Sequence, residues 1–146
     1  MNAKQLVHFV AACGSILFLA TTNASATYTI APEQIDDQQI YFGNAQRFEK
    51  PAAVDYTAIV KATPEYEEIK KKKIDSGSAR YWILMSDASN HAVKAISEVG
   101  EESNHDLIVS IGYLGKITPQ IPAEDVTEKV LEKLDPPKKS GKAKTK

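Results

Sequence analysis

Residues 63–104 read TPEYEEIKKKKIDSGSARYWILMSDASNHAVKAISEVGEESN and carry the signals of two helices joined by a turn. Thr63 stands before a proline, and glutamates follow at positions 65, 67 and 68, a pattern typical of a helix start. The cluster Ser76–Gly77–Ser78 breaks that helix. A second helix is expected from Ala79 to about Asn104, which predicts an antiparallel helical hairpin over residues 64–104.

Apolar residues recur along the second helix in alternating steps of four and three, which is the spacing of a heptad seam. They are Tyr81, Met85, Ala88, Ala92, Ala95 and Val99. At its start the helix also carries five large apolar residues in a row, Tyr81 to Met85. A helix cannot bury all five against one short partner, so some should face another subunit, a client or the core. Ordinary packing against the hairpin partner is the alternative.

A run of four lysines follows the glutamates of the first helix. The spacing predicts ion pairs of Glu67 with Lys71 and of Glu68 with Lys72. A nucleic-acid-binding patch would need basic residues without such neutralisation, together with stacking aromatic residues. The whole chain has 18 Lys+Arg against 19 Asp+Glu, a net charge of −1. Neither feature predicts binding to nucleic acid.

Two strands and a final helix are expected beside the hairpin. Ala53–Val60 is rich in β-branched and aromatic residues and predicts a strand, and Asp106–Leu114 predicts another. Asp125, with Glu128 three residues later, resembles a capping box and predicts a helix ending near Leu134. The expected fold is therefore α+β: a small β head, a protruding helical hairpin and a C-terminal helix.

The domain is expected to span residues 53–134 and to follow an extended, polar N-terminal lead over residues 27–52. Order within the lead is expected near Ile40–Phe42 and at Phe48. The segment 27–134 has 12 basic and 18 acidic residues, a net charge of −6. Residues 135–146 hold five Lys and one Asp and predict a basic, disordered tail. The charge of this tail would allow weak contact with an anionic membrane surface.

The first 26 residues have the three parts of a secretory signal peptide. Lys4 gives a positive start, residues 6–20 are mostly apolar, and Ala24–Ser25–Ala26 offers a cleavage site. Cleavage there leaves a chain without cysteine, so no disulfide is expected. Val10–Cys13 resembles a bacterial lipobox, which would instead leave Cys13 as a lipid anchor. We expect export to the periplasm, with lipid anchoring as the alternative.

No catalytic motif is recognisable in the sequence. After cleavage two histidines remain, His91 and His105, and their spacing does not suit a shared metal ion. Adjacent carboxylates such as Glu101 and Glu102 point apart on a helix and indicate a solvated face. We therefore expect no enzyme activity, no cofactor and no metal.

The order of elements and several local patterns resemble the Skp (OmpH-like) family of periplasmic chaperones. The resemblance covers about 80 residues, from Val54 to Leu134, and its motifs are patterns of apolar and capping residues rather than an invariant signature. The opening patterns are Val54-Asp55, Ile59-Val60 and Thr63-Pro64-Glu65-Tyr66. The closing patterns are Ala95-Ile96, Glu98-Val99, His105-Asp106-Leu107-Ile108-Val109, Asp125-Val126-Thr127-Glu128, Val130-Leu131 and Leu134.

The resemblance implies a homotrimer whose helical arms hold unfolded outer-membrane or other envelope proteins, here with arms shorter than is usual in the family. A trimeric structural or adaptor protein with a single partner and no general holdase activity is the alternative. The residues expected to contact clients are Tyr81, Trp82, Leu84 and Met85, rimmed by Lys70, Lys71, Lys72 and Lys73. The residues expected to carry oligomerisation are Ile59, Val60, Ile108 and Ile111.

Overall fold

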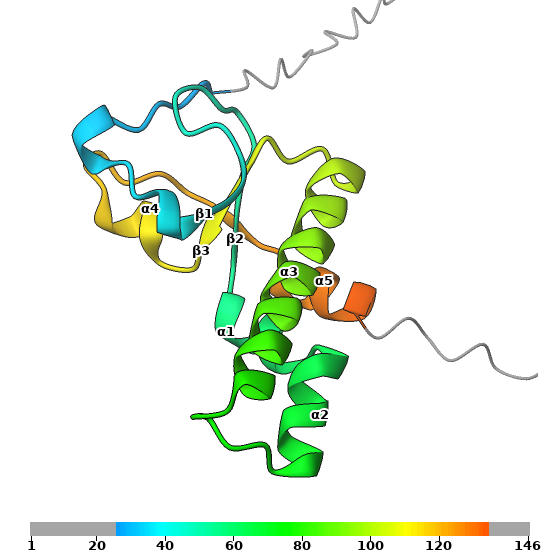
Figure 1. The fold of residues 1–146 in the computed structure, drawn as a ribbon. Coiled ribbons are helices and arrows are strands. Elements are labelled where there is room, and N and C mark those ends of the chain that lie inside the picture. Colours follow the sequence, from blue (N-terminus) through cyan, green and yellow to red (C-terminus); the bar gives the residue numbers. More distant parts are fainter. Residues whose placement is uncertain (1–25, 135–146) are drawn as a thin grey trace, which may run out of the picture.

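The computed structural model describes residues 26–134 and has a mixed α+β architecture with a four-stranded sheet (Figure 1). The predicted signal peptide up to residue 25, Cys13 and the basic tail lie outside the described residues. The strands are β1 (Ile40–Gly43), β2 (Pro51–Val54), β3 (Leu107–Ser110) and β4 (Glu124–Asp125). The helices are α1 (Tyr56–Lys61), α2 (Pro64–Lys72), α3 (Ala79–Glu102), α4 (Tyr113–Lys116) and α5 (Thr127–Leu134).

The sheet has the order β1-β3-β2-β4. β2 pairs with β3 and with β4 in parallel, whereas β1 pairs with β3 antiparallel. Parallel neighbours need a long crossover connection, and α1, α2 and α3 together form the crossover from β2 to β3. The helical arm is therefore an elongated crossover of the sheet. Among residues 26–134 no helix is both long and apolar enough to span a membrane.

The two faces of the sheet carry separate apolar cores. Ile108 points to the face covered by α1, α3 and α5, while its neighbours Leu107 and Val109 point to the other face. That second face is covered by α4 and by the N-terminal segment, which buries Ile30 and Phe48 almost completely. Residues 27–52, expected to form an extended lead, thus supply much of the core on this face of the sheet, and they also form β1.

The predicted strand over Ala53–Val60 is wrong in its second half. β2 ends at Val54, and the Asp55 side chain accepts a hydrogen bond from the Ala58 backbone N–H at 3.0 Å, which starts α1. The β-branched Ile59 and Val60 are buried on this short helix, because packing on α3 outweighs their preference for strands. The other predicted strand also ends early, at Ser110 instead of Leu114.

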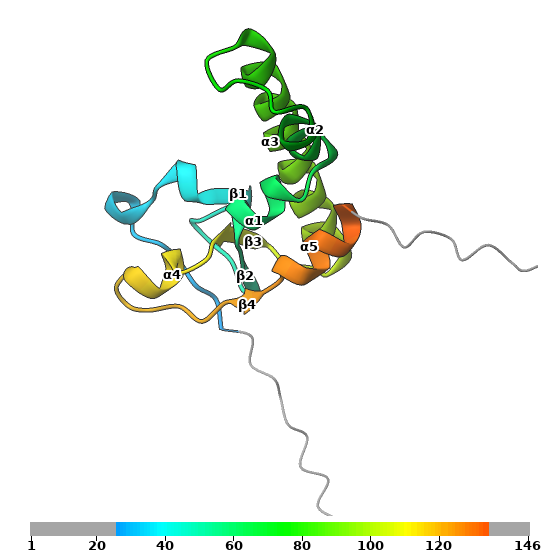
Figure 2. The same ribbon diagram turned by 90° about the horizontal axis from the view of Figure 1, so that it is seen from below.

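The hairpin forms as expected, and Figures 1 and 2 show it projecting from the sheet. Thr63 caps α2 and Ser78 caps α3, each accepting a hydrogen bond from a backbone N–H three residues on. The predicted heptad seam faces inward: its last four residues, Ala88 to Val99, are buried, while Tyr81 and Met85 are half-buried. The three seam alanines allow a close approach of the neighbouring helices.

Candidate functional site

The distal end of the arm gathers most of the residues that the sequence marks as a site. We define the arm tip as Lys70–Met85, which comprises the end of α2, the turn and the first two turns of α3. Because the chain reverses between Lys73 and Ser78, the lysine run and the apolar run come to the same end of the hairpin (Figure 1). The tip therefore carries a run of charged side chains beside a run of apolar side chains.

The apolar run of the tip divides into exposed and inward-facing residues. Trp82 and Ile83 are 66% and 61% exposed, whereas Tyr81, Leu84 and Met85 are half-buried. The Tyr81 and Trp82 rings meet edge to face, with their centroids 5.5 Å apart. Ile83 is missing from the sequence-predicted site, although it is the second most exposed large apolar residue of the described chain. Exposed apolar side chains at the end of a projection can contact another polypeptide.

The lysine run is partly neutralised within the arm. The predicted ion pairs of Glu67 with Lys71 and of Glu68 with Lys72 are confirmed, with N···O distances of 3.5 Å and 3.0 Å. Glu68 also pairs with Arg80 across the hairpin at 2.7 Å. Hydrogen bonds from Lys72 and then from Arg80 hold the pKa of Glu68 below its ordinary value.

An aromatic groove opens at the base of the arm, where α1, α2 and α3 meet. Its volume is about 320 Å³, and aromatic rings and a methionine supply much of its wall. The lining residues are Tyr56, Thr57, Val60, Lys61, Tyr66, Tyr81, Met85 and Ser89. Tyr81 and Met85 belong to the predicted site, whereas Tyr56 and Tyr66 were missed. The lining residues come from three different helices, so no local pattern in the sequence joins them.

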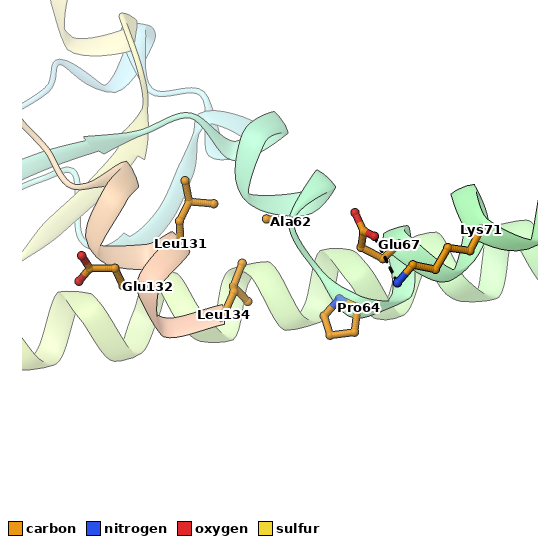
Figure 3. A pocket seen from close by; sticks show the side chains of 7 residues that line it. All are labelled: Ala62, Pro64, Glu67, Lys71, Leu131, Glu132 and Leu134. Atoms are coloured by element: carbon orange, nitrogen blue, oxygen red, sulfur yellow. Dashed lines mark ion pairs between the residues drawn. The ribbon is translucent and has the colours of Figure 1, made fainter. Parts of the chain in front are cut away.

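A second, wider groove separates the start of α2 from α5 (Figure 3). Its volume is about 730 Å³, with Leu131 and Leu134 of α5 on one side and the Glu67–Lys71 ion pair on the other. The remaining lining residues are Ala62, Pro64 and Glu132. Nothing in the local sequence indicated this groove, which depends on how α5 packs beside the arm.

The four residues expected to carry oligomerisation lie in two kinds of environment. Ile59, Val60 and Ile108 belong to the core on the helical face of the sheet and are at most 7% exposed. Only Ile111, just beyond β3, is at the surface, with 53% exposure. Three of these side chains are therefore covered by the same chain and are not free to face a neighbour.

The two histidines have separate structural environments. His91 of α3 lies 3.2 Å from a Glu65 carboxylate oxygen of α2. His105 is buried between α3 and β3, with its Nδ1 3.1 Å from the Lys50 carbonyl oxygen and its Nε2 3.8 Å from Glu124. Within residues 26–134 there is no group of three or more His, Asp or Glu side chains placed to hold a metal ion.

Comparison with protein-family models, curated proteins and solved structures gives no match for this chain. What the site can do follows from its geometry. The arm tip presents two exposed apolar side chains beside charged ones, and the groove at the base of the arm is largely apolar. Such an arrangement suits binding by many weak contacts with another polypeptide.

Proposed function

We propose that this chain is an exported, chaperone-like protein that binds unfolded envelope or outer-membrane proteins in the periplasm. The observation that carries the proposal is the arm tip, where Trp82 and Ile83 are exposed at the end of a projecting hairpin. A soluble domain gains nothing in stability from two large apolar side chains in water, so their exposure favours a role in contact with a partner.

The charged residues of the tip support the same function. Lys70 and Lys73 are exposed next to the paired Lys71 and Lys72, so the apolar side chains have a cationic rim. A rim of this kind keeps the free protein in solution while the apolar residues remain available. The aromatic groove at the base would extend the contact surface toward the head, since Tyr81 belongs to both the tip and the groove.

The arrangement of elements also supports an Skp-like architecture. A strand opens the head, a helical hairpin projects, and a strand and a helix close the head: β2, α2 with α3, β3 and α5. The proposal includes self-association, because one tip offers a small apolar area and several linked weak contacts bind much more tightly than one. The homotrimer implied by the resemblance would supply three tips.

An aggregation assay tests the proposal. An unfolded outer-membrane barrel protein is diluted from urea into buffer with increasing amounts of this protein, and light scattering is recorded. We expect suppression of scattering that saturates at about three chains per client, as one trimer per client requires. Scattering that is unchanged at a large excess would contradict chaperone activity and favour the structural or adaptor role.

Two variants locate the contact. Replacing Trp82 and Ile83 by serine should remove most of the suppression without unfolding the arm, because both side chains are mainly in solvent. Val93→Ser is the matched control, since it removes an exposed apolar side chain from the middle of α3, away from the tip. If the Val93 variant lost the activity and the tip variant kept it, client contact would have to be outside the tip.

A further inference from the structure

The side chain of His105 is buried between the end of α3 and β3, with 1% exposure. Its Nδ1 lies 3.1 Å from the carbonyl oxygen of Lys50. A carbonyl oxygen can only accept a hydrogen bond, so Nδ1 carries a proton and donates it. In the neutral form of this ring the other nitrogen, Nε2, is therefore an acceptor.

Nε2 of His105 has no donor to accept from. It is buried, and among residues 26–134 it has no hydrogen-bond partner. It faces the Glu124 carboxylate of β4, whose Oε2 lies 3.8 Å away. An ionised carboxylate cannot donate a hydrogen bond, so the neutral ring turns a lone pair toward a negative charge. A second proton on the ring converts this contact into an ion pair and leaves neither ring nitrogen unsatisfied.

The Glu124 carboxylate is held in the ionised form that this ion pair needs. Its other oxygen, Oε1, accepts a hydrogen bond from the Lys129 ammonium group of α5 at 2.7 Å. That hydrogen bond keeps the pKa of Glu124 below its ordinary value. The side chain of Glu124 is half exposed, so it has room to move closer to a charged ring while it keeps its contact with α5.

The other charged groups around the ring act in opposite directions. The Lys50 ammonium group, which donates to a backbone carbonyl at the end of α3, disfavours a second proton on the ring. The Asp106 carboxylate, which accepts from the Lys50 backbone N–H at 2.8 Å, favours that proton. At the end of α3 the Glu102 carboxylate is paired with Lys133. These charges largely offset one another, which leaves the carboxylate on β4 as the deciding group.

We propose that His105 and Glu124 form a pH-dependent contact: when the ring binds a second proton, the carboxylate joins it to Lys129 and holds β4 and the start of α5 against the α3–β3 junction. β4 has only two residues and pairs with β2 alone in the described sheet, so a side-chain anchor matters to it. The anchor is lost as the pH rises and the second proton leaves. The inference concerns the free protein and does not rest on client binding.

Nitrogen-15 NMR of the imidazole rings tests the proposal directly, at about pH 5.5 and at about pH 8. The variant His91→Gln identifies the signals of the other described histidine by their loss. For His105 we expect the Nδ1–H tautomer at the higher pH and protons on both nitrogens at the lower pH, with the protein folded at both. A ring that stays neutral at the lower pH in the folded protein would overturn the proposal. An Nε2–H tautomer at the higher pH would do the same.

Thermal unfolding gives the second measurement, with His91→Gln as the reference because the His91–Glu65 contact would respond over the same pH range. We expect its Tm to be higher at about pH 5.5 than at about pH 8, by about 2 °C or more. Adding Glu124→Gln offers an amide N–H to the neutral ring and an oxygen to Lys129, so this pH dependence should disappear. Glu132→Gln removes an exposed carboxylate of α5 instead and should retain it. Equal pH dependence with Glu124→Gln and Glu132→Gln would contradict the contact.

Discussion

The Glu68 carboxylate of α2 accepts a hydrogen bond from Arg80 of α3 at 2.7 Å, and the same oxygen accepts one from Lys72 at 3.0 Å. One acidic side chain thus joins the two helices of the arm close to the turn that connects them. This contact is exposed to solvent and lies beside the apolar packing of α2 on α3. Its contribution to stability should therefore depend on pH and on salt.

Neutralising Glu68 should loosen the arm at neutral pH. Hydrogen bonds from Lys72 and Arg80 lower the pKa of Glu68. The stabilising effect of the ionised Glu68 carboxylate is therefore fully present above the ordinary pKa of 4.5, and it is lost as the pH falls through the lower pKa of the folded state. Thermal unfolding of the parent and of Glu68→Gln from pH 3 to pH 7 checks this. We expect a small difference in Tm at pH 7 that closes toward pH 3.

Arg80→Gln provides the companion measurement for this pair. It removes the Glu68–Arg80 contact by changing the other partner. The double variant should therefore have a Tm close to that of each single variant. Fully additive effects on Tm would mean that the two side chains act independently, contrary to the structure.

Gly43 at the end of β1 should not tolerate a side chain. Its φ is +88°, and an added Cβ would lie 1.9 Å from the Asp106 carbonyl oxygen. Gly43→Ala should therefore lower the free energy of unfolding by at least about 1–3 kcal/mol in urea denaturation. Gly115→Ala is the control, because an added Cβ there meets nothing within 4 Å. Equal effects of the two substitutions would contradict the pairing of β1 with β3.

The cap at Asp55 should be needed for the turn from β2 into α1. Asp55→Ala removes the acceptor for the Ala58 N–H and should cost about 0.5–2 kcal/mol in the free energy of unfolding. Asp55→Asn keeps a side-chain oxygen acceptor and should recover most of that loss. An alanine variant as stable as the parent would argue that residues 55–61 do not form a capped helix.

The arm could be predicted from the sequence because its signals are local. Thr63 and Ser78 cap helices within three residues, Ser76–Gly77–Ser78 breaks the chain, and the heptad seam of α3 repeats over almost its whole length. The ion pairs of Glu67 and Glu68 likewise follow from four-residue spacing. The predicted start of α5 is also close, since Asp125 accepts a hydrogen bond from the Thr127 N–H.

The features that were missed depend on distant parts of the chain. Ile30 stands in a mostly polar stretch, and only the far face of the sheet explains its burial there beside Phe48, where order was expected. Ile59 and Val60 have a strand-like composition but bury the same side chains on a short helix, because Asp55 redirects the chain. The two grooves combine residues from three or more segments, so no periodic pattern could reveal them.

The emission of Trp82 gives the most direct test of the proposed function, because it is the only tryptophan in the chain and it lies at the arm tip. An unfolded outer-membrane protein without tryptophan is added to the purified protein while the emission spectrum is recorded. We expect a solvent-exposed spectrum for the free protein and a saturable shift to shorter wavelength as the client covers the indole. A spectrum that stays unchanged while the client remains soluble would contradict client contact at the tip.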